Sequence, residues 1–364
     1  MKRWLQWRII GETAFFFLVL LAVGAGLIAQ TLVYPVIDRP GENIYCCCVK
    51  EAFAAAKESI DLLLSNAQLD QVPLWDELLA AASRGVRVRV LLDESEWSTS
   101  ITEKNRPTIE FLKVHGIEAR FDDPAVTTHA KLVVVDRRVV ILGSSNWNHY
   151  AFTDQEQANV KVQDAQVGEV FATYFDRLWR GNLPPGGVRL DLSSLSAEGP
   201  LLIPIPEAVD TKNYAYVLLD LLRQAKRSIH VVMYRISYYP QYKGSLSNEI
   251  LHALVDAAAR GLDVKVLIDD CAFYPGSAEE NLEAALYLHL HGVGIHLDDP
   301  SETTHCKLVI IDEETVLLGS TNWNYYALEK NNEVDLALIG LPLVAAPYEQ
   351  LFRLLWEEGR RLDE

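Results

Sequence analysis

Apolar and polar residues follow the same order of helical and strand patterns twice along the chain. In each half, a segment with apolar residues at helical spacing precedes a short β-rich segment, two apolar strands joined by a tight turn, and an amphipathic segment. These segments are 51–59, 86–93, 129–144 and 168–181 in the first half, and 216–228, 263–269, 305–320 and 347–359 in the second. The alternation predicts an α/β fold in which a mixed sheet flanked by helices forms twice.

A segment rich in Gly, Pro and Ser separates the two halves, between Gly181 and Pro200. Such composition is typical of a connection between packed units. We therefore expect a first repeat at 38–182, a linker at 183–206 and a second repeat at 207–364.

The N-terminal region contains an uncharged span that matches the thickness of a membrane. No charged residue occurs from Thr13 to Ile37, and about twenty apolar residues are enough to cross a bilayer core. Basic residues precede this span and acidic residues follow it. The positive-inside bias predicts a cytoplasmic N-terminus at 1–8, a single-pass transmembrane anchor at 9–37 and an extracytoplasmic main body.

A cleaved signal peptide is the alternative interpretation, since a basic segment followed by apolar residues fits it as well. No A-x-A cleavage site follows the span. Leu32, Val33, Val36 and Ile37 carry the apolar run beyond the length of a signal peptide, which favours the anchor.

The chain is strongly acidic, with 33 Lys and Arg residues against 50 Asp and Glu residues and a formal net charge of −17. An acidic surface repels polyanions at long range, which disfavours broad capture of duplex DNA but leaves room for a local basic groove. Five arginines form a candidate cluster of this kind, although they fit solvated strand ends equally well: Arg84, Arg87, Arg89, Arg137 and Arg138.

Five cysteines do not form a disulfide framework, and no CxxC pair indicates a zinc site. Cys46, Cys47 and Cys48 are adjacent. We interpret the triplet as a buried or membrane-proximal apolar turn, with lipidation or redox chemistry as the alternative. Cys306 is expected to face the buried side of its strand.

One polar pattern occurs in both halves at identical spacing. TTHAKLVVVDRRVVILGSSNWN begins at position 127, and TTHCKLVIIDEETVLLGSTNWN begins at position 303. On a strand, positions i and i+2 face the same side, so His129 projects with Lys131, and His305 with Lys307. A fold does not need polar side chains duplicated in this way. The repeat therefore indicates one reaction centre built from two matching halves.

Two imidazoles and two ammonium groups in one cleft suit chemistry at phosphorus. The ammonium groups can surround a phosphoryl group and stabilise its developing charge without a metal. One imidazole can attack phosphorus while the other protonates the leaving oxygen and later deprotonates the incoming one. We expect no metal and no cofactor.

Each strand pair is followed by a segment that ends in Asn and Trp. Asn146 and Asn322 supply amide groups that can hydrogen-bond a substrate. Asp136 and Asp312 end the first strand of each pair, and we expect them to hold turns rather than to take part in catalysis.

Two HxKxxxxD motifs, each followed by GSxN, make the chain resemble the phospholipase D superfamily, which includes phospholipases, cardiolipin and phosphatidylserine synthases, and nucleases. The resemblance extends over 44–356 and implies two α/β lobes with the active site between them. It also implies a double displacement through a phosphohistidine, with His129 and His305 as nucleophile and general acid–base in an order that the sequence does not fix. The implied substrate ligands are Lys131, Lys307, Asn146 and Asn322, together with Ser144 and Ser320.

An acidic residue downstream of GSxN orients a catalytic histidine in this family. Glu333 occupies that position in the second half, whereas Gln157 occupies it in the first. A carboxylate raises the basicity of its imidazole and fixes the tautomer, while an amide fixes orientation only. We therefore expect the two histidines to have unequal roles, the partner of Glu333 being the more basic.

The favoured function is that of a membrane-anchored phosphodiesterase acting on phospholipid headgroups, by hydrolysis or transfer. An anchor would hold the cleft within reach of lipid, and the segment at 238–242, YYPQY, is a modest candidate for membrane contact. The alternative is a tethered nuclease acting on single-stranded DNA or RNA, which needs basic or aromatic residues along the strand path. A degenerate scaffold is disfavoured because both motifs are intact. Both also lie in one chain, so the site requires no oligomer.

Overall fold

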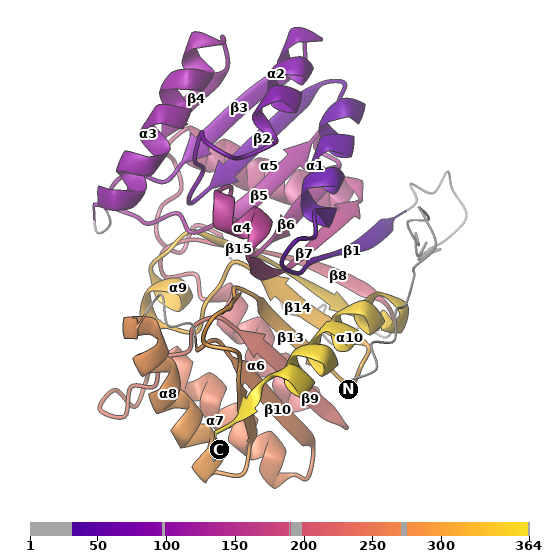
Figure 1. Cartoon of the computed structure of the whole chain (residues 1–364), viewed down its shortest axis with the longest axis vertical. Helices are drawn as coiled ribbons and strands as arrows, with labels where there is room; N and C mark the ends of the chain where they lie inside the picture. Colours follow the sequence, from indigo (N-terminus) through magenta and orange to yellow (C-terminus); the bar gives the residue numbers. More distant parts are fainter. Residues whose placement is uncertain (1–30, 97–98, 189, 191–198, 271–274, 363–364) are drawn as a thin grey trace, which may run out of the picture.

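The computed structural model describes residues 31–96, 99–188, 190, 199–270 and 275–362, which form two lobes of similar construction (Figure 1). Each lobe is built on a mixed β-sheet with helices packed against it. The expected α/β fold with two matching halves is confirmed.

The sheet of the first lobe combines parallel and antiparallel strands. Its order is β1 (Leu32–Asp38), β7 (Gln155–Gln163), β6 (Val139–Gly143), β5 (Lys131–Val135), β2 (Ser59–Leu64), β3 (Arg87–Leu92) and β4 (Glu118–Phe121). β2, β3 and β4 are parallel, and the remaining neighbours are antiparallel. The central strands are apolar along most of their length because both faces are covered.

The second lobe repeats this arrangement. Its sheet order is β16 (Arg360–Arg361), β11 (Gly294–Leu297), β10 (Asp263–Ile268), β9 (Ser228–Met233), β13 (Lys307–Ile311), β14 (Thr315–Gly319), β15 (Glu333–Ile339) and β8 (Leu201–Glu207). β9, β10 and β11 are parallel, as β2, β3 and β4 are in the first lobe. The strands that carry the two repeated motifs, β5 and β13, therefore occupy equivalent places in the two sheets.

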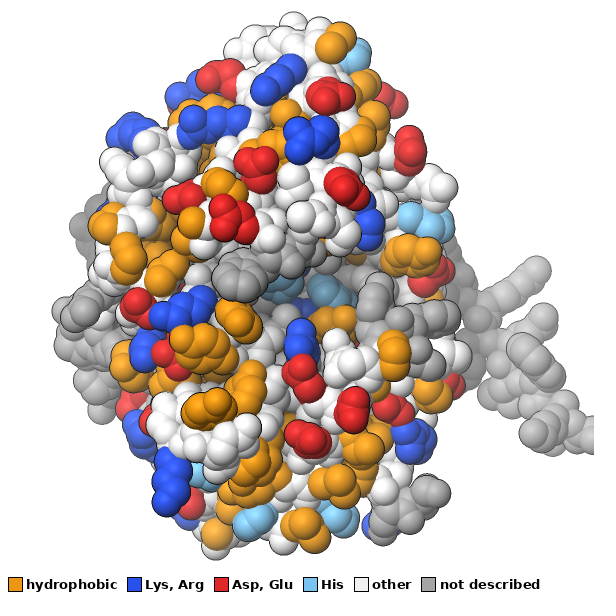
Figure 2. Space-filling model, turned by 90° about the vertical axis from the view of Figure 1, so that its left-hand side faces the viewer, with side chains coloured by type: hydrophobic (Ala, Val, Ile, Leu, Met, Phe, Trp, Pro, Cys, Tyr) orange, Lys and Arg blue, Asp and Glu red, His pale blue; other side chains and the backbone are white. Residues whose placement is uncertain are grey.

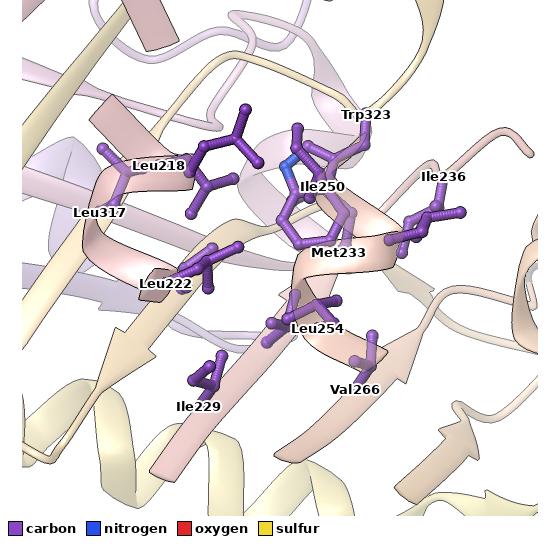
Figure 3. Packing of buried hydrophobic residues seen from close by; sticks show 14 of the residues in the cluster. Leu218, Leu222, Ile229, Met233, Ile236, Ile250, Leu254, Val266, Leu317 and Trp323 are labelled. Atoms are coloured by element: carbon purple, nitrogen blue, oxygen red, sulfur yellow. The ribbon is translucent and has the colours of Figure 1, made fainter. Parts of the chain in front are cut away.

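Helices cover the outer face of each sheet. They are α1 (Ile44–Ala55), α2 (Trp75–Ser83) and α3 (Thr99–Val114) on the first lobe, and α6 (Asn213–Gln224), α7 (Leu246–Ala259) and α8 (Pro275–Leu290) on the second. In the second lobe, leucines of α6 and α7 pack on β9 and β10 around Met233 and Trp323 (Figure 3). The first lobe has a corresponding core, in which Cys46 and Cys48 are buried. The expected burial is confirmed for these two cysteines, whereas Cys47 is exposed. The expected turn is wrong, because all three cysteines lie within the helix α1.

A third core joins the lobes. It contains apolar residues of both sheets and of two closing helices, α5 (Ala165–Trp179) and α10 (Pro342–Glu358), and it includes Cys306. α5 reaches β8 of the second lobe, and α10 reaches β1 of the first. The short strand β12 (Thr303–Thr304) of the second lobe pairs with β7 of the first. The lobes are thus held together by shared packing and by backbone pairing.

The first strand corrects the expected end of the membrane anchor. Residues 32–37, which we assigned to the anchor, belong to β1, which pairs along its whole length with β7 and buries Val33 and Val36. Residues that extended the apolar run therefore belong to the globular body, because an edge strand with a buried face is as apolar as a membrane span. The remainder of the predicted anchor lies outside the described residues. Within the described ranges, no helix is both long and apolar enough to span a bilayer.

The expected linker is also shorter than 183–206, because β8 begins at Leu201 and pairs with β15. Pro204 and Pro206 lie within this strand. β8 is an edge strand, and an edge position tolerates proline because it leaves one row of N–H groups unpaired. Proline content alone is therefore a poor marker of the linker's end.

Asp136 and Asp312 hold tight turns, as expected. Each has a positive φ, near 50°, in the turn that joins its strand to the next. The Asp136 carboxylate accepts backbone N–H groups from Lys57, Glu58 and Ser59. Asp312 does the same for residues 226–228. Both side chains thus join the motif strand to the start of β2 or β9.

Replacing Asp136 with Asn should lower the free energy of unfolding by about 1–3 kcal/mol, because one carboxylate oxygen that accepts N–H groups becomes an NH₂ donor facing them. Asn tolerates the positive φ, so backbone strain does not contribute. Chemical denaturation would measure the change, with Asp70→Asn at an exposed loop position as the matched control. Equal stability of the two variants would contradict the structural role.

Candidate active site

The two repeated motifs meet at the seam between the lobes. His129 and His305 lie two residues before β5 and β13 begin, and each is tied to the opposite lobe through its backbone. The N–H of His129 donates to the carbonyl of Asn332 at 2.9 Å, and that of His305 donates to the carbonyl of Glu156 at 3.0 Å. Each catalytic candidate is thus positioned by a strand of its own lobe and by the chain of the other.

Both histidines line one cleft with a volume of about 350 Å³. Its other lining residues include Asn146, Tyr150 and Tyr234. Figure 2 shows histidine side chains at the bottom of a hollow in this face of the molecule. The side chain of His129 is 22% exposed, whereas His305 is buried. The expected convergence of the two halves on one site is therefore present in the structure.

The acidic residue expected to orient a histidine acts across the lobes. Glu333 of the second lobe lies 3.0 Å from Nδ1 of His129 in the first. It also accepts hydrogen bonds from the hydroxyl of Ser320 and the amide of Asn331. These contacts hold the Glu333 carboxylate beside Nδ1 of the imidazole. Nε2 is the ring nitrogen that Glu333 does not contact.

His305 has a different partner set. Its Nδ1 lies 3.0 Å from the carbonyl of Ser144 and 3.4 Å from the amide oxygen of Gln157. Gln157 in turn accepts from the Ser144 hydroxyl and donates to Gln155. The two histidines are therefore oriented alike, but His129 alone faces a carboxylate at this position.

Burial lowers the pKa of both imidazoles. For His129, desolvation lowers the pKa while the Glu333 carboxylate opposes the shift. For His305, desolvation together with the ammonium groups of Lys307 and Lys131 holds the pKa well below its ordinary value. The directions agree with the expectation that the partner of Glu333 is the more basic of the pair.

Lys131 and Lys307 are buried beside the histidines. Each Nζ donates to the carbonyl of the histidine two residues earlier. Burial lowers the pKa of Lys131 to about 8, and burial and the neighbouring Lys131 hold the pKa of Lys307 well below its ordinary value. An anion placed among these groups would favour their charged forms. The site is therefore electrostatically suited to a phosphate.

Asn146 and Asn322 have open hydrogen-bonding capacity. The side-chain oxygen of each is buried without a hydrogen-bond partner among the described residues. Asn146 lines the cleft, and Asn322 occupies the matching position of the second lobe. Buried polar groups are normally paired, so the open amide of Asn146 beside the cleft suits ligand binding. The unpaired oxygen is an acceptor, and the NH₂ group of the same amide is the part that can donate to an anion.

Ser144 and Ser320 differ from the expectation of substrate contact. Both are fully buried, and their hydroxyls donate to Gln157 and Glu333. Their carbonyls accept from His305 and His129. They support the histidines and their partners instead of lining the cleft, because the turn after each strand directs their side chains inward.

Tyr234 is a site residue that the sequence analysis missed. Its ring lies 4.6 Å from the imidazole of His305, centroid to centroid, and the ammonium of Lys307 lies 4.6 Å from the ring centroid. The equivalent position in the first lobe, at the end of β2, is Ser65. Aligning the ends of the two equivalent strands in the sequence would have revealed this difference. The aromatic side chain makes the His305 side of the cleft narrower and more apolar.

Two of the five arginines considered for nucleic acid are paired with acidic residues. Arg89 is buried and bonded to Asp61 and Asp176. Arg137 pairs with Glu169 and Asp176. Neither arginine lines the cleft. Arg89 and Arg137 are therefore part of the packing under α5, whereas Arg84 and Arg87 are exposed.

The chain matches the family described as "Cardiolipin synthase, PLD-like domain" over residues 49–179 and 218–356. Cardiolipin synthase A of Escherichia fergusonii is 24% identical over 323 residues, which cover 79% of this chain and 62% of the relative. The human mitochondrial cardiolipin hydrolase is 33% identical over 128 residues, which cover 35% of this chain and 48% of the relative. The chain spans about half the length of the cardiolipin hydrolases that it matches.

Among solved structures, the phosphatidylserine synthase of Haemophilus influenzae has the same fold. Its TM-score is 0.71 at 13% identity, with 90% of this chain and 87% of the other covered. The polyphosphate kinase of Porphyromonas gingivalis matches with a TM-score of 0.58 over 89% of this chain and 50% of the other. These structures show the fold, and the two family segments, which cover more than half of the chain, establish that it belongs to the PLD-like family of cardiolipin synthase, a family of enzymes that act on phosphodiesters.

Proposed function

We propose that this chain is a phosphodiesterase of the phospholipase D type that cleaves or transfers the headgroup of a phospholipid through a phosphohistidine. One observation carries the proposal: the histidines of the two motifs, from separate lobes, line one cleft, and the buried ammonium group of each motif lysine contacts its own histidine. Burial lowers the pKa of all four groups. Burying four ionisable groups together is energetically unfavourable in their charged forms, and a bound anion would offset this cost.

In the proposed first step, His129 is the nucleophile. Its Nδ1 faces Glu333, so the neutral tautomer carries its proton there and leaves the lone pair of Nε2 for phosphorus. Attack forms the P–N bond and breaks the P–O bond to the headgroup, and His305 gives its proton to the departing oxygen. Glu333 stabilises the positive charge that develops on the phosphorylated imidazole.

In the second step, water or an alcohol completes the exchange. His305, now neutral, takes a proton from the incoming hydroxyl while its oxygen attacks phosphorus and the P–N bond breaks. Water gives hydrolysis, and a lipid alcohol gives transfer. Lys131, Lys307, Asn146 and Asn322 hold the phosphoryl oxygens in both steps, so the proposed reaction needs no metal.

A phospholipid fits the surroundings of the cleft better than a nucleic acid strand. Two further cavities adjoin the cleft, one sharing Ser95 with it and the other sharing Tyr150 and Gln155. Among their described lining residues, Arg106 alone is basic. The acidic ones are Glu94, Glu96, Glu103, Asp154 and Glu302. A polyanion running along this line would meet repulsion on both sides. A single phosphodiester needs only the centre.

The relatives support the same substrate class. Their names refer to cardiolipin hydrolysis and cardiolipin synthesis. We also propose that the N-terminal segment anchors the chain in a membrane, with its first residues cytoplasmic and the lobes extracytoplasmic. A tether would keep lipid at high local concentration around the cleft. One chain supplies both histidines, so the proposal requires no oligomer.

The first test is a side-by-side assay of the full-length chain in EDTA, on mixed phospholipid vesicles and on labelled single-stranded DNA. We expect headgroup release from lipid, and a loss of roughly a thousandfold or more in His129→Asn and in His305→Asn, because each removes a covalent or proton-transfer role. His115→Asn, at an exposed position, is the matched control. Cleavage of DNA without release of lipid headgroups would replace this proposal with the nuclease alternative.

The unequal histidines can be tested by NMR titration of the ligand-free protein. Both imidazoles should titrate below the ordinary histidine range, and His305 at lower pH than His129, because burial disfavours the charged form and Glu333 opposes it at His129 only. Glu333→Gln should lower the pKa of His129, and Gln157→Glu should raise that of His305. Indistinguishable titration of the two wild-type imidazoles would rule out the assignment of roles.

A further inference from the structure

Glu156 is a buried carboxylate at the seam between the lobes that the proposed mechanism does not use. It lies on β7, and its backbone carbonyl accepts the N–H of His305 at 3.0 Å. Its side chain is fully buried, and neither carboxylate oxygen has a hydrogen-bond partner among the described residues. Buried carboxylates are normally hydrogen-bonded or paired. The residue that holds the backbone of one catalytic histidine thus carries an acid without donors around it.

The matching position of the other lobe is Asn332, a neutral amide. Its backbone carbonyl accepts the N–H of His129, as that of Glu156 does for His305. Its side-chain amide also donates to the hydroxyl of Thr128 at 2.9 Å, which adds a second bond between the lobes. An ionised carboxylate cannot donate in this way, whereas a protonated one has an O–H group. The two histidines are therefore held by seam residues of different chemistry.

The charged groups that act on Glu156 come from the elements packed around β7. Nη2 of Arg39, which follows β1, lies 3.8 Å from the Glu156 carboxylate, but it lies 2.7 Å from that of Glu358 on α10. The carboxylates of Asp298, which follows β11, and Glu302, which precedes β12, act on Glu156 with like charge. Further titratable side chains next to it in the strand pairing are Asp38, His305 and Cys306.

Repulsion at this place acts between the two segments that the seam contact joins. Thr304 of β12 pairs with Glu156, and Glu302 lies two residues before Thr304. An ionised Glu156 would face the Glu302 and Asp298 carboxylates in buried surroundings, where like charges repel strongly. Separation of β7 from the segment 298–305 would relieve this repulsion. The same movement would lengthen the hydrogen bond between the N–H of His305 and the carbonyl of Glu156.

Burial, together with the Glu302 carboxylate, raises the pKa of Glu156 to about 7. The side chain is therefore neutral at acidic pH and ionised above this value. Because the pKa is higher in the folded protein than in an unfolded chain, the contribution of Glu156 to stability is complete below the unfolded pKa. It is lost as the pH rises to about 7.

We propose that Glu156 is a positioning residue for His305, whose neutral form keeps the seam contact and whose ionisation loosens it. The His305 side of the site then responds to pH through this contact, whereas the His129 side, held by Asn332, does not. The catalytic consequence rests on the proposed function, because it needs His305 to act on the substrate. The change in the seam contact does not.

The test compares the full-length wild type with Glu156→Gln, which is similar in shape and permanently neutral. Headgroup release from phospholipid vesicles is measured in EDTA from about pH 5.5 to about pH 8.5. The rate of the variant divided by that of the wild type, normalised to its acidic value, should rise by about threefold to tenfold across this range. Only the wild type ionises at this position. Glu283→Gln, at an exposed position on α8, should give a constant ratio.

A second measurement follows the ring signals of His305 by NMR in the ligand-free proteins. The pKa of His305 is held well below its ordinary value by burial and by Lys307 and Lys131, so a change in its signals near pH 7 reports on its surroundings. The wild type should show such a change, and Glu156→Gln should lack it. Glu302→Gln, at an exposed position, removes one like charge and should move the change to lower pH. If Glu156→Gln does not fold, Glu302→Gln carries the test.

The outcomes separate the seam contact from the catalytic proposal. Equal pH dependence of headgroup release in the wild type and Glu156→Gln, with release still dependent on His129, overturns the role of Glu156 and leaves the proposed function standing. A His305 signal without a change near pH 7, or with a change that neither variant alters, also overturns this role. Absence of headgroup release from the wild type at every pH overturns the proposed function, and the NMR comparison then still decides whether Glu156 positions His305.

Discussion

The active site depends on an exchange of backbone contacts between the lobes. The segment before β5 pairs with the start of β15, through His129 and Asn332, and the segment before β13 pairs with the start of β7, through His305 and Glu156. These pairings place each histidine opposite the end of a strand from the other lobe, where Glu333 and Gln157 lie. A lobe alone would hold a histidine without its orienting partner. The central core and β12 keep the exchange in register.

This arrangement explains how a protein of net negative charge can hold a cationic centre. Lys131 and Lys307 are surrounded by protein instead of solvent, and burial favours their neutral forms. The electrostatic repulsion between the two lysines is therefore small in the ligand-free protein, because their neutral forms are favoured until an anion binds. Glu333 and Asp93 lie close enough to raise the pKa of Lys131, and further acidic residues line the adjoining cavities, where they influence which molecule approaches.

The fold and the centre of the site could be predicted because their signals are local or duplicated. The helical and strand periods of the apolar residues predicted the two lobes, and the i, i+2 spacing predicted that each lysine lies beside its histidine. Prediction from the sequence failed where a contact between residues far apart in the chain determines the structure. The apolar face of β1 resembles a membrane span until its pairing with β7 is known. Ser144 and Ser320 were assigned to the substrate from the family resemblance, which does not reveal that their hydroxyls donate to Gln157 and Glu333.

The differences between the halves carry as much information as the repeat. A symmetric site would let either histidine attack, and a headgroup could then leave on either side. Here the first half has Ser65 and Gln157 where the second has Tyr234 and Glu333. The carboxylate supports positive charge on His129, while the ring of Tyr234 packs against His305. In the proposed mechanism, the covalent intermediate therefore forms on the Glu333 side of the cleft, and the leaving group departs on the Tyr234 side.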